Sequence, residues 1–202
     1  GGVDAFLIET CQDLLQVKCC INACLQALDE KGKATDDVPI CVSVTIEQMG
    51  TMLTGSSIEA AAHVLRGYPI LSLGLNCATG PVEMAEHIHW LGKHWPGHVS
   101  VYPNAGLPVL VEGRTEYPLT AGPMAEAVEK FIENDGVGLI GGCCGTTPEH
   151  IAALAELADG RAAPKRETAP LKRSSTSLYG PVEHRQENTF QIVGERCNAS
   201  GS

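Results

Sequence analysis

Residues 137–157, VGLIGGCCGTTPEHIAALAEL, contain one complete unit of the expected fold. A short apolar run from Val137 to Ile140 is followed by a glycine-rich turn and then by a helical pattern that reaches Leu157. Thr147 is suited to the N-cap of that helix, and Pro148 is suited to its first position, where a missing backbone N–H costs nothing. The stretch therefore predicts a buried strand that leads directly into a helix.

The same alternation of apolar runs and helical patterns occurs four times upstream. The four apolar runs are Val3 to Ile8, Pro39 to Ile46, Ile70 to Leu75 and His98 to Tyr102. Each run is followed by apolar residues spaced three and four apart, which is the spacing of one helical face. Five consecutive strand–helix units predict an α/β protein with a parallel sheet and helical crossovers.

Periodicity alone does not separate an open doubly wound sheet from a (β/α)8 TIM barrel. The polar motifs favour the barrel, because each falls at the carboxyl end of a predicted strand. They are Glu9, Asn76-Cys77, Asn104 and Cys143-Cys144. Both folds place their sites at that edge, but a spread over four of the five predicted strands suits a ring better. A doubly wound nucleotide binder is disfavoured because no G-x-G-x-x-G follows a strand.

Composition excludes several classes of protein. An apolar fraction of 44% and a charged fraction of 19% are typical of a globular domain. The net charge of −10 argues against nucleic-acid binding, which needs an excess of Lys and Arg. No apolar run approaches the length of a membrane span and no signal peptide opens the chain, so we expect a cytoplasmic protein. Because the chain starts at Gly1, we interpret it as a fragment whose upstream part is missing.

Residues beyond 160 predict a change of organisation. We assign residues 1–160 to the barrel and residues 161–188 to a linker, since Pro, Ser, Thr and charged residues there show little periodicity. Phe190 to Val193 then reads as a new strand, so residues 189–202 are predicted to begin a second domain.

Nine cysteines in a chain without a secretion signal indicate reduced thiols, some of which could bind a metal. Catalytic zinc commonly has three protein ligands and one open position. Cys77, Cys143 and Cys144 lie at strand ends, and the glycines around the adjacent pair would allow both sulfurs to converge. A redox-active pair is the competing interpretation, but a disulfide between adjacent cysteines closes a strained ring.

The other candidates for metal ligands are weaker. We expect the remaining cysteines of the predicted helices and strands to be small buried residues: Cys11, Cys19, Cys20, Cys24 and Cys41. His87 and His89 are two apart on a predicted helix and do not face each other. His150, in the first turn of the last helix, is expected to be solvated or to act as a local cap.

Five motifs together resemble the homocysteine-binding domain of the zinc-dependent homocysteine methyltransferases. They are Leu7 to Thr10, Thr51 to Gly55, Gly74 to Pro81 (GLNCATGP), Pro103 to Pro108 (PNAGLP) and Gly141 to His150 (GGCCGTTPEH). The resemblance implies a partial (β/α)8 barrel that contains the fourth to eighth strand–helix units, without the first three. It also implies that Cys77, Cys143 and Cys144 bind Zn2+, that Glu9 binds the amino group of homocysteine, and that Asn104 lies beside the same substrate.

The last residues, VGERCNASGS from Val193 to Ser202, resemble the opening strand of the pterin-binding domain of cobalamin-dependent methionine synthases. In that family a homocysteine barrel is followed by pterin-binding and cobalamin-binding domains, which would be its partners. The resemblance implies that Glu195 and Asn198 belong to the folate site, and that methylcobalamin, recharged by 5-methyltetrahydrofolate, donates the methyl group. Cys197 stands where the family often has Thr.

Two alternatives stay open. The chain could use betaine or S-methylmethionine as methyl donor, or it could be a non-catalytic module that zinc stabilises. Five strands of an eight-stranded barrel also leave two open edges, so we expect the isolated chain to be unstable or inactive.

Overall fold

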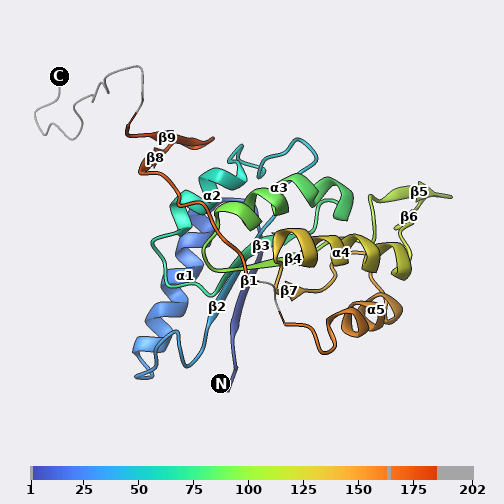
Figure 1. Cartoon of the computed structure of the whole chain (residues 1–202), viewed down its shortest axis with the longest axis horizontal. Coiled ribbons are helices and arrows are strands. Elements are labelled where there is room, and N and C mark those ends of the chain that lie inside the picture. Colours follow the sequence, from blue (N-terminus) through green and yellow to red (C-terminus); the bar gives the residue numbers. More distant parts are fainter. Residues whose placement is uncertain (1, 163–164, 186–202) are drawn as a thin grey trace, which may run out of the picture.

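The computed structural model describes residues 2–162 and 165–185 (Figure 1). Its strands and helices alternate along most of the chain. In order they are β1 (Phe6–Cys11), α1 (Leu14–Asp29), β2 (Ile40–Val44), α2 (Ile58–Leu65), β3 (Ser72–Asn76), α3 (Pro81–His94), β4 (His98–Tyr102), β5 (Val109–Val111), β6 (Arg114–Glu116), α4 (Ala121–Asp135), β7 (Leu139–Ile140), α5 (Pro148–Ala158), β8 (Ser174–Thr176) and β9 (Pro181–Glu183).

The five predicted strands form one parallel sheet in the order β1-β2-β3-β4-β7. Each helix contacts the next one along the chain, from α1 to α5, so the helices form one layer that wraps the outside of the sheet (Figure 1). A doubly wound sheet would reverse its strand order and carry helices on both faces. The described strands show no reversal, which is consistent with part of a TIM-barrel-like domain.

The two faces of the sheet differ in side-chain size. The face toward the helices has large apolar side chains such as Ile40, Val42 and Val44, all of them fully buried. The opposite face of β3 and β4 includes the small residues Ser72, Gly74 and Ser100. Gly74 lies so close to β4 that an added Cβ would be 2.0 Å from the carbonyl oxygen of Ser100. The tight contact requires glycine, because any other residue would force the two strands apart.

The helices begin where the sequence predicts. Pro81 and Pro148 occupy the first positions of α3 and α5, and Thr147 is the N-cap of α5. His150 caps this helix as well, because its Nδ1 accepts the Thr147 N–H at 3.2 Å. The expectation of a solvated His150 is wrong. Its ring is buried, and its Nε2 donates a hydrogen bond to the carbonyl oxygen of Leu119 at 2.8 Å.

The cysteines outside the strand ends are only partly as predicted. Cys11 and Cys41 are buried and Cys20 and Cys24 are half-buried, whereas Cys19 is exposed. Cys19 falls on the outer side of α1, because the buried stripe of this helix passes through its neighbours two residues away on either side.

Two hairpins were not expected from the sequence. The loop between β4 and α4 contains the antiparallel pair β5 and β6, joined through Glu112 and Gly113, which both have positive φ. The second pair, β8 and β9, lies within the predicted linker and contacts α2. All six residues of the first pair are exposed, so no buried periodic pattern marks it in the sequence.

Residues 165–180, here named the strap, run across the outer surface of the helix layer (Figure 1). The Arg166 guanidinium donates to the carbonyl oxygens of Gly92 at 2.9 Å and Trp95 at 3.1 Å, and also to that of Gly97. At the other end, the Tyr179 carbonyl accepts the Ser57 N–H at 2.9 Å. The strap therefore connects the end of α3 to the start of α2.

Within residues 2–162 and 165–185, none of the helices combines the length and the apolarity needed to cross a bilayer.

Candidate metal centre and substrate site

Three cysteine sulfurs meet at the carboxyl edge of the sheet. Cys77 directly follows β3, while Cys143 and Cys144 follow β7. The three Sγ atoms all lie within 4.8 Å of one another, and those of Cys77 and Cys144 are 3.7 Å apart. Residues 67 positions apart in the sequence thus share one site. These are the three sulfurs that the sequence singled out.

The spacing of the sulfurs fits zinc. A tetrahedral site with Zn–S bonds of about 2.3 Å places its sulfurs about 3.8 Å apart. The observed separations agree with that arrangement after small side-chain adjustments. Thiolates are soft ligands, which favours zinc over magnesium or calcium. Among the described residues this is the one group of three potential ligands close enough to share an ion.

Local backbone geometry directs the sulfurs inward. Cys77 and Ala78 both have left-handed φ values, of 63° and 60°, which non-glycine residues seldom adopt. This turn is held by hydrogen bonds from Cys77 N to the Tyr102 carbonyl at 3.2 Å and from Thr79 N to the Cys77 carbonyl at 2.7 Å. The strained turn redirects Cys77 from the strand axis toward the paired cysteines.

The surroundings of Cys77 favour its neutral thiol. Burial raises the pKa of Cys77 to about 11, and the neighbouring Cys143 and Cys144 contribute to the same upward shift. A cation at the centre of the three sulfurs would reverse this effect, because a coordinating thiol is deprotonated.

Asn104 is buried beside the paired cysteines. The side-chain Oδ1 of Asn104 accepts a hydrogen bond from the backbone N–H of Cys144 at 3.0 Å. The backbone N–H of Asn104 donates to the Thr79 carbonyl oxygen at 3.1 Å. It therefore links the loop after β3 to the loop after β7. A contact with substrate, as the sequence predicts, stays a prediction.

Glu9 lies at the exposed end of β1. Burial raises the pKa of Tyr102, and the charge of Glu9 is among the further causes of that shift. Glu195 and Asn198, the predicted folate-site residues, lie outside the described residues.

Sequence reasoning did not single out Tyr117. Its ring packs on the backbone of Gly145, where an added Cβ would be only 2.2 Å from Cγ. Burial raises the pKa of Tyr117, and the nearby Cys144 raises it further. The segment is held in place by the bond from Leu119 N to the Ala105 carbonyl at 2.9 Å. The contact joins residues from separate loops, so only the folded chain reveals it.

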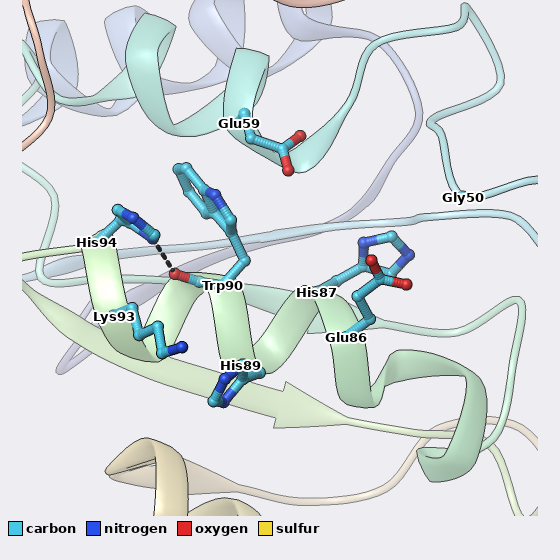
Figure 2. Close-up of a pocket in the computed structure, with 8 residues that line it drawn as sticks. All are labelled: Gly50, Glu59, Glu86, His87, His89, Trp90, Lys93 and His94. Carbon is cyan, nitrogen blue, oxygen red and sulfur yellow. Dashed lines mark hydrogen bonds between the residues drawn. The ribbon is translucent and has the colours of Figure 1, made fainter.

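A groove of about 490 Å³ lies elsewhere, on the outer side of α3 (Figure 2). Trp90 and His94 stack there with ring centroids 4.4 Å apart, and burial lowers the pKa of His87. No cysteine lines this groove. The groove is thus lined by residues other than those of the candidate metal centre.

The fold and the three-cysteine site can now be compared with those of known proteins. The model of the family "Homocysteine S-methyltransferase" matches residues 1–158, so the chain belongs to that family.

Curated relatives point to one branch of the family. The chain is 46% identical over 206 residues to methionine synthase of Mycobacterium leprae (strain TN) and 45% identical over 202 residues to methionine synthase of Mycobacterium tuberculosis (strain ATCC 25618 / H37Rv). Both matches cover 100% of this chain but 17% of the relative.

A solved structure shares the fold. The crystal structure of the homocysteine methyltransferase MmuM from Escherichia coli, in its apo form, matches with a TM-score of 0.56 and 25% sequence identity. The match covers 78% of this chain and 50% of that one.

Proposed function

We propose that this chain forms the part of a methionine synthase that binds zinc and homocysteine, and that it transfers a methyl group to the sulfur of homocysteine. The observation that carries the proposal is the convergence of Cys77, Cys143 and Cys144 in a member of the homocysteine S-methyltransferase family. Three thiolates leave a fourth position for a substrate sulfur. Structural zinc sites are closed by four protein ligands, so this donor set favours catalysis over a purely structural module.

In the proposed reaction the homocysteine thiol loses its proton to solvent and its sulfur forms a bond to the methyl carbon with its own electron pair. The bond from that carbon to the donor breaks, and the donor leaves with the bonding electron pair. Zinc, when held by the three cysteines, would supply the positive charge that keeps the substrate sulfur ionised at neutral pH. Glu9 would bind the α-ammonium group through its carboxylate. Asn104 would keep the loop of Cys144 in place beside the substrate.

The proposed methyl donor is methylcobalamin, recharged by 5-methyltetrahydrofolate. The support is the identity of 45–46% to methionine synthases over the whole chain, including residues beyond the match to the family model. On this proposal residues 1–160 belong to the homocysteine barrel, residues 161–188 connect it to the next domain, and residues 189–202 begin a pterin-binding domain with Glu195 and Asn198. Free thiols at the site also suit the reducing conditions of the cytosol.

The ligand assignment can be tested with Cys143→Ser in the full-length protein. We expect this variant to lose bound zinc and homocysteine methylation together, because two sulfurs and a hydroxyl make a much weaker zinc site. Cys19→Ser, which changes an exposed cysteine outside the site, should keep both. Full zinc content and homocysteine binding after Cys143→Ser would show that the assignment is wrong.

The donor can be tested in the same protein. Methylcobalamin, betaine and S-methylmethionine are each supplied with homocysteine, and methionine formation is measured. We expect turnover with methylcobalamin. Turnover with betaine or S-methylmethionine alone would replace the proposed donor while leaving the zinc site intact.

A further inference from the structure

Asn76, the last residue of β3, has a fully buried side chain in the middle of the candidate site. Four groups surround its amide. Oδ1 accepts from Thr10 N at 2.9 Å and from Ser43 Oγ at 2.7 Å. Nδ2 lies 2.8 Å from Thr10 Oγ1 and 3.8 Å from Cys143 Sγ. An amide has two donor hydrogens and two acceptor lone pairs, so every hydrogen-bonding position of Asn76 has a partner.

The orientation of this amide is fixed by its partners. The backbone N–H of Thr10 can only donate, so the atom that faces it must be the amide oxygen. The NH2 group must then point toward Thr10 Oγ1 and Cys143 Sγ. A sulfur that faces an N–H donor acts as acceptor, and a thiolate is the better acceptor. The amide therefore presents an N–H donor to the Cys143 sulfur.

The same amide contacts the irregular part of β1 just after Glu9, where the register of the strand shifts. Thr10 has a left-handed φ of 57°, an uncommon conformation for a β-branched residue. Asn76 bonds both the backbone N–H and the hydroxyl of Thr10, which holds this residue in that conformation. One side chain thus connects the loop of Cys143 to the strand end that carries Glu9.

We propose that Asn76 is a positioning residue that donates an N–H···S hydrogen bond to the Cys143 sulfur and holds the Glu9–Thr10 segment of β1 at a set separation from it. The part that concerns Glu9 rests on the proposed function, in which Glu9 and the metal bind opposite ends of homocysteine. The part that concerns Cys143 requires only that the three sulfurs bind a metal. Outer-shell partners of this kind commonly affect metal affinity by about 10- to 100-fold.

Asn76→Asp in the full-length protein separates the two halves of the proposal. The carboxylate keeps both acceptor bonds, and the Thr10 hydroxyl can rotate to donate to it. At Cys143 the change replaces a donor by a negative charge. We expect zinc affinity to fall by about tenfold or more. With Co2+ in place of zinc, the sulfur-to-metal charge-transfer band should move to longer wavelength, because the sulfur loses its hydrogen bond.

Two further variants serve as matched comparisons. Ser43→Ala removes one bond from the oxygen side of the same amide, so its cobalt spectrum should remain that of the wild type. Thr10→Val removes the hydroxyl partner and leaves Cys143 untouched. It should weaken homocysteine binding by about three- to tenfold, the usual effect of one lost hydrogen bond, again with an unchanged cobalt spectrum.

An unchanged cobalt spectrum and an unchanged zinc affinity in Asn76→Asp would overturn the proposal. A spectral shift in Ser43→Ala equal to that in Asn76→Asp would also overturn it, because it would show that Asn76 acts only through packing. A wild-type protein that binds the metal without binding homocysteine would refute the proposed function, while the cobalt spectra would still decide the role of Asn76. A wild-type protein that takes up no metal would overturn both.

Discussion

Cys77 has both an uncommon backbone conformation and a raised pKa. Its left-handed φ is held by the loop bonds around it, and burial near two other sulfurs raises its pKa to about 11. At neutral pH its proton must therefore leave when a metal binds. Zinc and protons compete for the same sulfur, and the sign of the pH effect follows directly from this competition.

Zinc affinity is expected to rise with pH. Below a pKa of about 11 each proton displaced from a cysteine contributes about a tenfold change in affinity per pH unit. Between pH 6.5 and 8.5 the affinity should therefore increase by about 100-fold or more. Competition with a chelator of known affinity measures it, and proton release in weak buffer provides an independent check. A zinc affinity independent of pH would contradict the assignment of Cys77 as a ligand.

Glu9→Gln should weaken homocysteine binding without releasing zinc. The variant keeps the size of the side chain and removes the charge that would pair with the α-ammonium group, so we expect the KM for homocysteine to rise by about tenfold or more. Glu30→Gln, at the far end of α1, is the matched control. Steady-state kinetics and zinc analysis are both needed, because equal zinc loss in Glu9→Gln would indicate a structural role instead.

At the scale of elements, close approaches of the backbone determine how strands and helices meet. Gly74 brings β3 against β4, and Gly92 brings α3 against the end of α4, where an added Cβ would lie 2.7 Å from the Asp135 carbonyl oxygen. In both places the obstructing atom belongs to the backbone, which cannot rotate away as a side chain can. Small residues at these positions set the spacing of the layers.

Gly74→Ala is expected to destabilise the domain by about 3 kcal/mol, since overpacking a well-packed interior forces backbone shifts. The new methyl group would meet both the carbonyl and the hydroxyl oxygen of Ser100. Gly67→Ala is the control, because nothing lies within 4 Å of its added Cβ. Chemical unfolding followed by circular dichroism measures the difference. Equal stability of the two variants would mean that β3 and β4 have room for a methyl group between Gly74 and Ser100.

Arg166 holds one end of the strap on the helix layer through its bonds to the carbonyl groups at the end of α3. Arg166→Ala would remove the donors that satisfy the carbonyl groups at the end of α3, and hydrogen bonds from a charged group contribute about 1.5–3 kcal/mol. Hydrogen exchange in the strap and at the end of α3 should therefore become faster. Arg161→Ala removes an exposed ion pair with Glu129, whose contribution is about 1 kcal/mol at most. Similar exchange in both variants would argue against the capping role.

At the scale of the whole molecule, the three-cysteine site brings together the loop after β3 and the loop after β7, which are far apart in the sequence. The loops after β3 and β7 belong to strands that are not neighbours, because β4 lies between them. A metal held by both loops would link three consecutive strands of the sheet at one edge. Binding to the folded form alone stabilises it in proportion to the logarithm of the metal concentration.

Removal of zinc should accordingly lower the thermal stability of this domain. At free zinc about 100 times Kd the stabilisation is about 2.7 kcal/mol, equivalent to about 5–10 °C in Tm for a domain of this size. Differential scanning calorimetry with and without a chelator measures it. The difference should vanish in Cys143→Ser, and an equal difference in that variant would place the stabilising metal elsewhere.

Much of the fold could be predicted because strand and helix signals are local. The apolar runs, Pro81 and Pro148 define element type and direction within a few residues, and the parallel sheet follows from their alternation. The hairpin of β5 and β6 escaped prediction because its side chains are all exposed. Burial of His150 escaped it too, since its partner Leu119 lies on another loop.

The sequence by itself determined the alternating elements, the three candidate sulfur ligands and the family resemblance, because these depend on residue type and short spacing. Only the tertiary structure decided that the strands keep their chain order and that the three sulfurs lie within 4.8 Å of one another. It also decided which side chains surround them. Asn76 and Tyr117 are near Cys143 and Cys144 only because β3, β4 and β7 end at one edge, and such proximity is a property of packing.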